Sequence, residues 1–297
     1  MVVERLNRRH ARVKLPKLGW VRFRLSRSLS GTVVRSATVA RDGKHWFVSF
    51  VIEDGMATPV DHEACNTSVG VDRGVRVAIA TSDGRMKDRD FLSNGERRRA
   101  LNLQRQLSRS TRGSRNSARK RTAYQAIRAR ERLRRKDFCA QIAHDLVTNF
   151  AVVVIEDLKT KQMTRSAKGT VDQPGVNVRP KSGLNRAILK KGWHQFALAL
   201  GSASRYSGTR IVTVPPQLTS QRCSQCGHLD PKSRESQAIF RCTLCSHTEN
   251  ADVNAAKNIL SAGLAETACQ DTHPPEGAVS SKQEPAGNRE ELLLQPA

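Results

Sequence analysis

The chain has 297 residues, of which 51 are Lys or Arg and 27 are Asp or Glu, so its formal net charge is +24. This excess points to a polyanionic partner, with nucleic acid as the first candidate and an anionic membrane surface as the second. No apolar run approaches the ~18 residues of a spanning helix, and residues 1–10 lack the apolar core of a secretory signal. We therefore expect a cytoplasmic protein of one large or two modest domains, with no membrane segment.

The first 66 residues predict a small β domain followed by a linker. Short alternating runs such as WVRFRL at 20–25 and HWFVSFVIE at 45–53 are typical of strands. Basic residues occupy alternate positions of these runs. That pattern suits a sheet laid on phosphates, and a merely solvated face is an equal alternative. Residues 54–66 have the composition of a linker.

A hairpin and two basic helices are predicted next. Two β-branched runs within 67–86 flank a glycine-containing bend, and the first strand ends near Asp72. Residues 97–136 hold 16 Lys or Arg and one acid, Glu131. The segment GSRNS at 113–117 divides this stretch into two helices, the second of which continues to about residue 149. The density of positive charge favours contact with a nucleic-acid backbone over an ordinary solvated face.

The remaining elements complete an α/β order. Residues 151–158, AVVVIEDL, predict a strand buried on both faces that ends in Glu156. A loop at 169–183, an amphipathic helix at 184–208 and a short strand within 209–217 follow. The segment from about residue 265 is polar and is expected to be disordered.

Four of the seven cysteines have the spacing of a metal site. Cys223, Cys226, Cys242 and Cys245 form C-x2-C-x15-C-x2-C, at the short end of the spacing of a zinc ribbon. Four thiolates complete a tetrahedron and leave no open position for hydrolysis, so we predict a structural zinc ion. The other three cysteines, at positions 65, 139 and 269, are expected to be single thiols.

Three carboxylates stand where an apolar or helix-forming run would not need an acid. Asp72 and Glu156 end predicted strands, and Asp252 begins a helix-like run after the cysteines. Clustered carboxylates bind Mg²⁺ or Mn²⁺, and a two-ion site can cleave a phosphodiester. A structural role is equally open for each one. Asp252 would then cap a helix, Asp72 would serve a turn, and Glu156 would pair with an arginine.

Five motifs, in this order along the chain, resemble the TnpB (OrfB) proteins of bacterial insertion sequences. They are VGVDRGVRVAIATSDG, VVVIEDLKTKQM, VPPQLTSQRCSQCG, RCTLCS and ADVNAAKNIL. The resemblance begins near residue 14, where KLPKLGWVRFRL is similar to the family's wedge-type β-barrel, and extends to about residue 260. It implies an α/β fold with an RNase H-like (RuvC-type) nuclease core, a zinc ribbon inserted in that core, and a partial β-barrel before it.

The resemblance also implies roles and boundaries. Asp72, Glu156 and Asp252 match the family's catalytic acids, which work with Mg²⁺ or Mn²⁺, and the four ribbon cysteines match its zinc ligands. We predict a partial β-barrel nucleic-acid-binding domain at 1–53, a linker at 54–66, a nuclease core at 67–215 with its basic helical pair at 97–149, a zinc ribbon at 216–249, a final RuvC-like segment and helix at 250–264, and a disordered tail at 265–297.

The implied function is that of a transposon-encoded, RNA-guided, metal-dependent DNA endonuclease that acts in transposition. Its partners would be a guide RNA from the transposon end and a DNA target, which would place it on the nucleoid when bound. The resemblance sets neither the guide sequence, nor the target-adjacent motif, nor the oligomeric state.

The chain departs from the family pattern in three places. Asn250 stands where the family usually has an acid or similar residue, and Ser246 stands where glycine usually follows the last cysteine. A first barrel strand and a helical recognition module are expected upstream, so we predict an N-terminally shortened copy. Two rivals stay open: a catalytically impaired nucleic-acid-binding remnant that regulates transposition, and a zinc-ribbon RNA-binding protein of ribosomal type that would not need the three acids.

Overall fold

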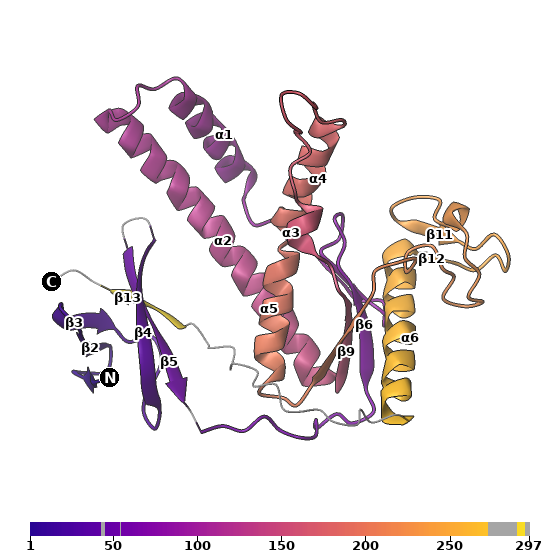
Figure 1. The fold of residues 1–297 in the computed structure, drawn as a ribbon, viewed down its shortest axis with the longest axis horizontal. Coiled ribbons are helices and arrows are strands. Elements are labelled where there is room, and N and C mark those ends of the chain that lie inside the picture. The colour runs from indigo at the N-terminus through magenta and orange to yellow at the C-terminus, as the bar shows by residue number, and fades with distance from the viewer. Residues whose placement is uncertain (43–44, 54, 273–289, 295–297) are drawn as a thin grey trace. The chain divides into compact units, whose positions relative to one another are not determined.

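The computed structural model describes residues 1–297 except 43–44, 54, 273–289 and 295–297 (Figure 1). The chain forms two compact units, one comprising 1–57, 94–129 and 280–297, and the other comprising 58–93 and 130–279. Within the described residues, no helix combines the length and the apolar character that crossing a membrane requires.

Two three-stranded sheets share the core of the first unit. β1 (Val3–Arg5), β2 (His10–Leu15) and β3 (Gly19–Arg24) form one antiparallel sheet. β4 (Val33–Asp42), β5 (His45–Glu53) and β13 (Glu290–Leu294) form the other. Apolar side chains of β2, β3 and β5 meet between the sheets, where the rings of Phe23 and Phe50 lie 5.4 Å apart. In the described part of the chain the strands make two separate sheets, so the predicted barrel is not shown.

The C-terminal segment contains more regular structure than its composition predicts. α6 (Ala251–Thr272) continues beyond residue 265, where the sequence analysis places the start of a disordered tail. Residues 265–272 contain no glycine or proline, so no strong stop signal ends the helix at position 265. β13 also lies within this tail and pairs with β5 on the edge opposite β4. A free strand edge offers unpaired backbone groups to any extended segment of the same unit.

The two basic helices are present. α1 spans Asn94–Ser108 and α2 spans Arg115–Asn149, so the break falls at the predicted position. Of the sixteen basic residues within 97–136, all are exposed except Lys120, Arg134 and Arg135, which are half-buried. Arg134 donates to the carbonyl of Phe91 at 3.0 Å, and Arg135 donates to the Gln195 side chain at 2.7 Å. The other thirteen cations face solvent, which leaves a ridge of positive charge along both helices and the turn between them.

A five-stranded mixed sheet organises the second unit. Its strands are β6 (Ser68–Asp72), β7 (Ile79–Thr81), β8 (Met86–Lys87), β9 (Val152–Glu156) and β10 (Arg210–Val214), in the spatial order β10-β9-β6-β7-β8. β6, β7 and β8 are antiparallel neighbours, whereas β9 and β10 run parallel to β6. The predicted hairpin is confirmed by the pairing of Val71 with Thr81. The strands predicted within 151–158 and 209–217 are confirmed as β9 and β10.

Helices cover both faces of this sheet, which explains why its strands are apolar on both sides. One face packs on the C-terminal half of α2 and on α5 (Trp193–Ser204) through a core that includes Val69, Val71 and Val153. The other face packs on α6 through Val154, Val214 and Ile259 (Figure 1). α6 lies so close to β6 that a side chain at Gly70 would meet the carbonyl oxygen of Ala256 at 2.1 Å.

The helix predicted at 184–208 is two helices, and the first begins within the predicted loop. α4 spans Val178–Lys191 and α5 begins at Trp193. Gly192 separates them in a left-handed conformation with φ of 76°, which ends α4 as a glycine C-cap does. Pro180 lies in the first turn of α4, where a missing backbone N–H costs no hydrogen bond, so the proline is compatible with an earlier start. A single-turn helix, α3 (Thr160–Met163), follows β9.

A small cysteine-rich module connects β10 to α6. It contains the short helix η1 (Pro231–Ser233) and the hairpin of β11 (Ile239–Arg241) and β12 (Thr248–Asn250). β12 ends directly where α6 begins, so the module and the helix share one continuous backbone.

Candidate active site and metal centre

Asp72 and Glu156 end adjacent parallel strands on the same face of the sheet. β6 and β9 pair with Gly70 opposite Val154 and Val71 opposite Ile155, so the register places Asp72 beside Glu156. Side chains alternate along a strand, and Val71 and Ile155 belong to the core on the α2 and α5 side. The next residue on each strand therefore points to the opposite face, which is the face that α6 covers.

Asp252 reaches the same site from the first turn of α6. Its Oδ2 lies 3.7 Å from the position that a Cβ at Gly74 would occupy, just beyond the end of β6. Asp252 does not cap the helix. That role belongs to Asn250, whose Oδ1 accepts hydrogen bonds from the backbone N–H of Asp252 at 2.9 Å and of Val253 at 3.3 Å. The departure at Asn250 is thus a helix cap that leaves the Asp252 carboxylate available to the site.

All three carboxyl groups have raised pKa values, and burial is the first cause for each one. Burial, and then the charges of Glu156 and Asp252, raises the pKa of Asp72 from 3.8 to about 7. Burial also raises the pKa of Glu156, against a hydrogen bond from Thr219, and raises the pKa of Asp252, against the charge of Arg234. Three acids sharing one poorly solvated site create a demand for positive charge that a bound cation would meet.

Two further side chains, which the sequence did not indicate, lie next to these acids. Arg234, which follows η1, lies with Nη2 at 3.3 Å from Asp252 Oδ1. Thr219 donates from Oγ1 to Glu156 Oε1 at 2.7 Å. No spacing marks either residue, because both lie in irregular segments whose position depends on the cysteine module.

Arg73 is a third missed residue, next to Asp72 in the chain. It is buried and donates to the backbone carbonyl of Glu156 and, at 3.5 Å, to that of Trp193. The guanidinium therefore connects the ends of β6 and β9 to the start of α5. Its position directly after a strand-ending acid was a signal available in the sequence.

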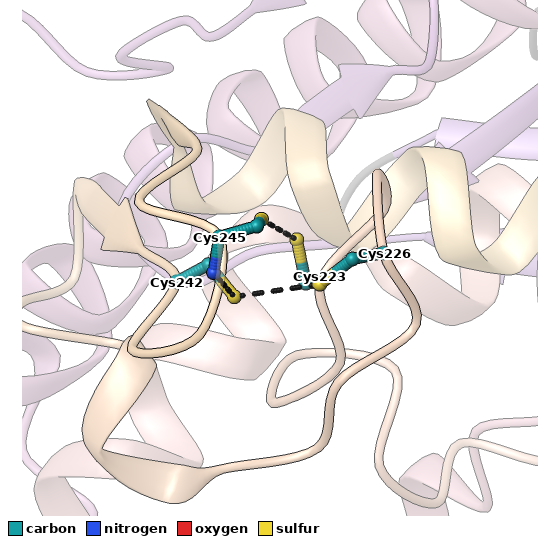
Figure 2. Close-up of side chains that lie close together, drawn as sticks. All are labelled: Cys223, Cys226, Cys242 and Cys245. Atoms are coloured by element: carbon teal, nitrogen blue, oxygen red, sulfur yellow. Dashed lines mark hydrogen bonds between the residues drawn. The ribbon is translucent and has the colours of Figure 1, made fainter.

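The four predicted cysteines form a second centre. Among the residues that the structure describes, they are the only group of three or more His, Cys, Asp or Glu whose ligand atoms all lie within 4.8 Å of one another. Cys223 Sγ lies 3.7 Å from Cys245 Sγ, and Cys226 Sγ lies 3.6 Å from Cys242 Sγ (Figure 2). Zn–S bonds of about 2.3 Å in a tetrahedron place the sulfurs about 3.8 Å apart, so this donor set fits zinc. The three acids do not meet the same spacing.

Two similar turns present these thiols. The backbone N–H of Cys223 donates to the His228 carbonyl and that of Cys242 donates to the His247 carbonyl, each at 2.9 Å. A hydrogen bond from the Cys245 N–H to Cys242 Sγ at 3.5 Å lowers the pKa of the Cys242 thiol, whereas the pKa of the Cys226 thiol in the same cluster is raised. His228 and His247 thus contribute backbone carbonyls to the turns, and the four sulfurs alone form the cluster.

Comparison with known proteins finds a family match over each of the two centres. Residues 50–167 match the OrfB_IS605 family, described as "Probable transposase", and residues 193–259 match the "Cas12f1-like, TNB domain" family. The chain is 41% identical over 265 residues to the "Putative RNA-guided DNA endonuclease InsQ" of Escherichia coli strain K12, an alignment that covers 89% of this chain and 65% of that protein. The chain belongs to the TnpB/OrfB family.

Other TnpB/OrfB relatives align over a similar extent. A "Putative RNA-guided DNA endonuclease" of Streptomyces pristinaespiralis is 32% identical, over 89% of this chain and 63% of that protein. The chain thus spans slightly less than two thirds of the length of these two curated relatives. A solved Cas12f1–sgRNA–target DNA complex aligns with a TM-score of 0.40 at 21% identity, over 75% of this chain and 55% of that chain.

The segments that match these two family models contain all the predicted site residues. Asp72 and Glu156 lie in the first matched segment, and the four cysteines and Asp252 lie in the second. The resemblance read from the five motifs is therefore confirmed at the level of the family.

Proposed function

We propose that this protein is an RNA-guided, metal-dependent DNA endonuclease with an RNase H-like (RuvC-type) core, encoded by an insertion sequence and acting in transposition. The observation that carries the proposal is the convergence of Asp72, Glu156 and Asp252 from three separate elements into one buried, electrostatically coupled site. The mixed sheet of order β10-β9-β6-β7-β8, with helices on both faces, supports it, because the family resemblance implies an α/β core. The names of the two aligned relatives, each a putative RNA-guided DNA endonuclease, support it as well.

Asp72, Glu156 and Asp252 would hold Mg²⁺ or Mn²⁺ in this proposal. Such ions bind oxygen ligands, activate water and stabilise the negative charge of a phosphodiester under attack. The raised pKa of Asp72 means that part of its population carries a proton near neutral pH until a cation displaces it. Arg234 would hold Asp252 in place and add a positive charge beside the scissile phosphate.

The basic ridge of α1 and α2 would contact the nucleic-acid backbones. Its exposed arginines and lysines carry no base-reading pattern, so we assign them to phosphates, with base pairing to a guide RNA providing sequence recognition. Binding through this ridge should weaken steeply with salt, because each neutralised phosphate releases counterions.

The test is cleavage by the zinc-loaded chain with its co-purified RNA, in Mg²⁺, on single- and double-stranded DNA. Asp72→Ala should abolish cutting while RNA binding stays nearly unchanged. Asp157→Ala is the matched control. Asp157 directly follows Glu156 in the chain, is exposed, and forms an ion pair in which its Oδ2 lies 2.5 Å from Lys159 Nζ. Metal-dependent cutting that persists in Asp72→Ala would refute the site. A wild-type chain that binds RNA and DNA without cutting would support the impaired remnant instead.

A further inference from the structure

The segment between β10 and the first cysteine pair presents a threonine to one of the proposed catalytic acids. Thr219 is 9% exposed, and its Oγ1 lies 2.7 Å from Glu156 Oε1 and 3.4 Å from the Pro216 carbonyl oxygen. A hydroxyl carries one proton, and a short bond to a carboxylate is much stronger than a long bond to a carbonyl. The proton is therefore directed at Glu156, where it fixes one oxygen of the carboxylate.

Thr219 is itself held by α6. Asn258 donates from Nδ2 to the Thr219 carbonyl at 2.8 Å and to the Arg222 carbonyl at 2.7 Å. One turn earlier, Asn254 donates to the same Arg222 carbonyl at 2.8 Å and accepts from the Ser224 N–H at 2.9 Å. Both asparagines are buried, and residues four apart lie on one face of a helix. This face of α6 therefore clamps the backbone from Thr219 to the residue after Cys223.

The residue before Thr219 adopts a backbone conformation that leucine rarely takes. Leu218 has φ of 65° although the residue is 46% exposed and gains little from packing. Its carbonyl accepts hydrogen bonds from the N–H groups of Gln221 and Arg222, each at 3.1 Å. Strain of this kind persists only where the surroundings impose it, and it is concentrated at functional sites. Here the turn aims the Thr219 hydroxyl at Glu156.

We propose that Thr219 is a positioning residue that fixes the Glu156 carboxylate for cation binding and connects it, through Asn258, to the base of the cysteine module. This inference rests on the proposed function, since it takes Glu156 as a ligand of a divalent cation. The cysteine module then supports two of the three acids by separate routes. It sets the start of α6, and hence Asp252, through the continuous chain after β12, and it sets Glu156 through Thr219.

Calorimetric titration of the zinc-loaded full chain with Mn²⁺ tests the inference without measuring cleavage. Thr219→Val removes the hydroxyl at nearly constant volume and should weaken Mn²⁺ affinity about 10-fold, the scale on which residues supporting a metal ligand act. Thr219→Ser keeps the hydroxyl and should stay within about 3-fold of the wild type. Thr209→Val is the matched control, because Thr209 is a buried threonine whose Oγ1 lies 3.0 Å from both the Val147 and the Phe150 carbonyl oxygens and hydrogen-bonds to none of the acids.

Zinc content and melting temperature, measured for each variant, show whether the fold is retained. If Thr219→Val does not fold, Thr219→Ala and Thr219→Ser make the same comparison of a missing with a retained hydroxyl. Wild-type affinity in the variant without the hydroxyl, or an equal loss in Thr209→Val, would overturn the inference. Glu156→Gln distinguishes a failure of the proposed metal site from a failure of the positioning role of Thr219. If this variant binds Mn²⁺ as tightly as the wild type, the proposed metal site is wrong. If it loses affinity while Thr219→Val does not, the positioning role alone fails.

Discussion

Replacing Asp72 with asparagine should stabilise the magnesium-free protein, and the gain should grow with pH. The folded protein raises the pKa of Asp72 from 3.8 to about 7, chiefly because the carboxyl is buried and lies near two other acids. The stability that a raised pKa contributes is complete below 3.8 and is lost as pH rises through about 7. Above that pH, the folded state carries a charge that the unfolded state holds at lower cost.

The magnitude follows from the size of the shift. A rise from 3.8 to about 7, at about 1.36 kcal/mol per unit, corresponds to about 4 kcal/mol at pH 8. At pH 5 most of the folded population is protonated, and the same linkage gives about 2 kcal/mol. An asparagine side chain has no charge to lose or gain, so the Asp72→Asn variant should exceed the wild type in unfolding free energy by these amounts. Mg²⁺ at pH 8 should narrow the difference, because it stabilises only the chain that retains the acid.

Urea denaturation of zinc-loaded protein between pH 5 and pH 8.5, followed by tryptophan fluorescence, measures the difference. Trp193 reports on the relevant unit because its Nε1 donates to the Gly74 carbonyl, two residues after Asp72, at 3.1 Å. Asp157→Asn removes the same charge from an exposed position and should change stability by less than about 1 kcal/mol at every pH. A pH-independent difference between Asp72→Asn and the wild type, or a loss of stability at pH 8, would refute the electrostatic coupling of the three acids.

Three further substitutions test the cysteine module and its junction with α6. Ser246 has φ of 57°, close to the 74° of Gly227 at the equivalent position of the other turn. Because glycine adopts this left-handed conformation without the cost that serine carries, Ser246→Gly should raise the unfolding free energy by about 1 kcal/mol. A lower melting temperature for the variant would contradict this. Asn250→Ala removes the cap of α6 and should cost about 1 kcal/mol, measured by urea midpoint, whereas Asn250→Asp should restore most of the loss. Cys242→Ser should reduce zinc content and, with it, Mg²⁺-dependent cleavage, because Asp252 follows the module directly; wild-type cleavage in the zinc-depleted variant would disprove that coupling.

Much of this architecture could be predicted because it depends on local sequence. The β-branched runs at β6, β9 and β10 determine strands whatever lies around them. The C-x-x-C turns are closed by hydrogen bonds within a few residues, so the spacing of Cys223, Cys226, Cys242 and Cys245 was sufficient to predict their cluster. The helical pair and its charge follow equally from composition. The break at Gly192 was missed because amphipathic periodicity continues across it, although the glycine itself was a visible stop signal.

Most of the strands, the basic helical pair, the cysteine cluster, the three candidate acids and the family could be recognised from the sequence alone. The side chains that contact the acids became apparent only from the folded chain. Thr219 meets Glu156 across 63 positions and Arg234 meets Asp252 across 18, and neither pair has a fixed spacing that a pattern could reveal. Local hydrogen bonds and side-chain periodicity are properties of short segments, whereas these contacts exist only once the sheet, α6 and the cysteine module have packed together.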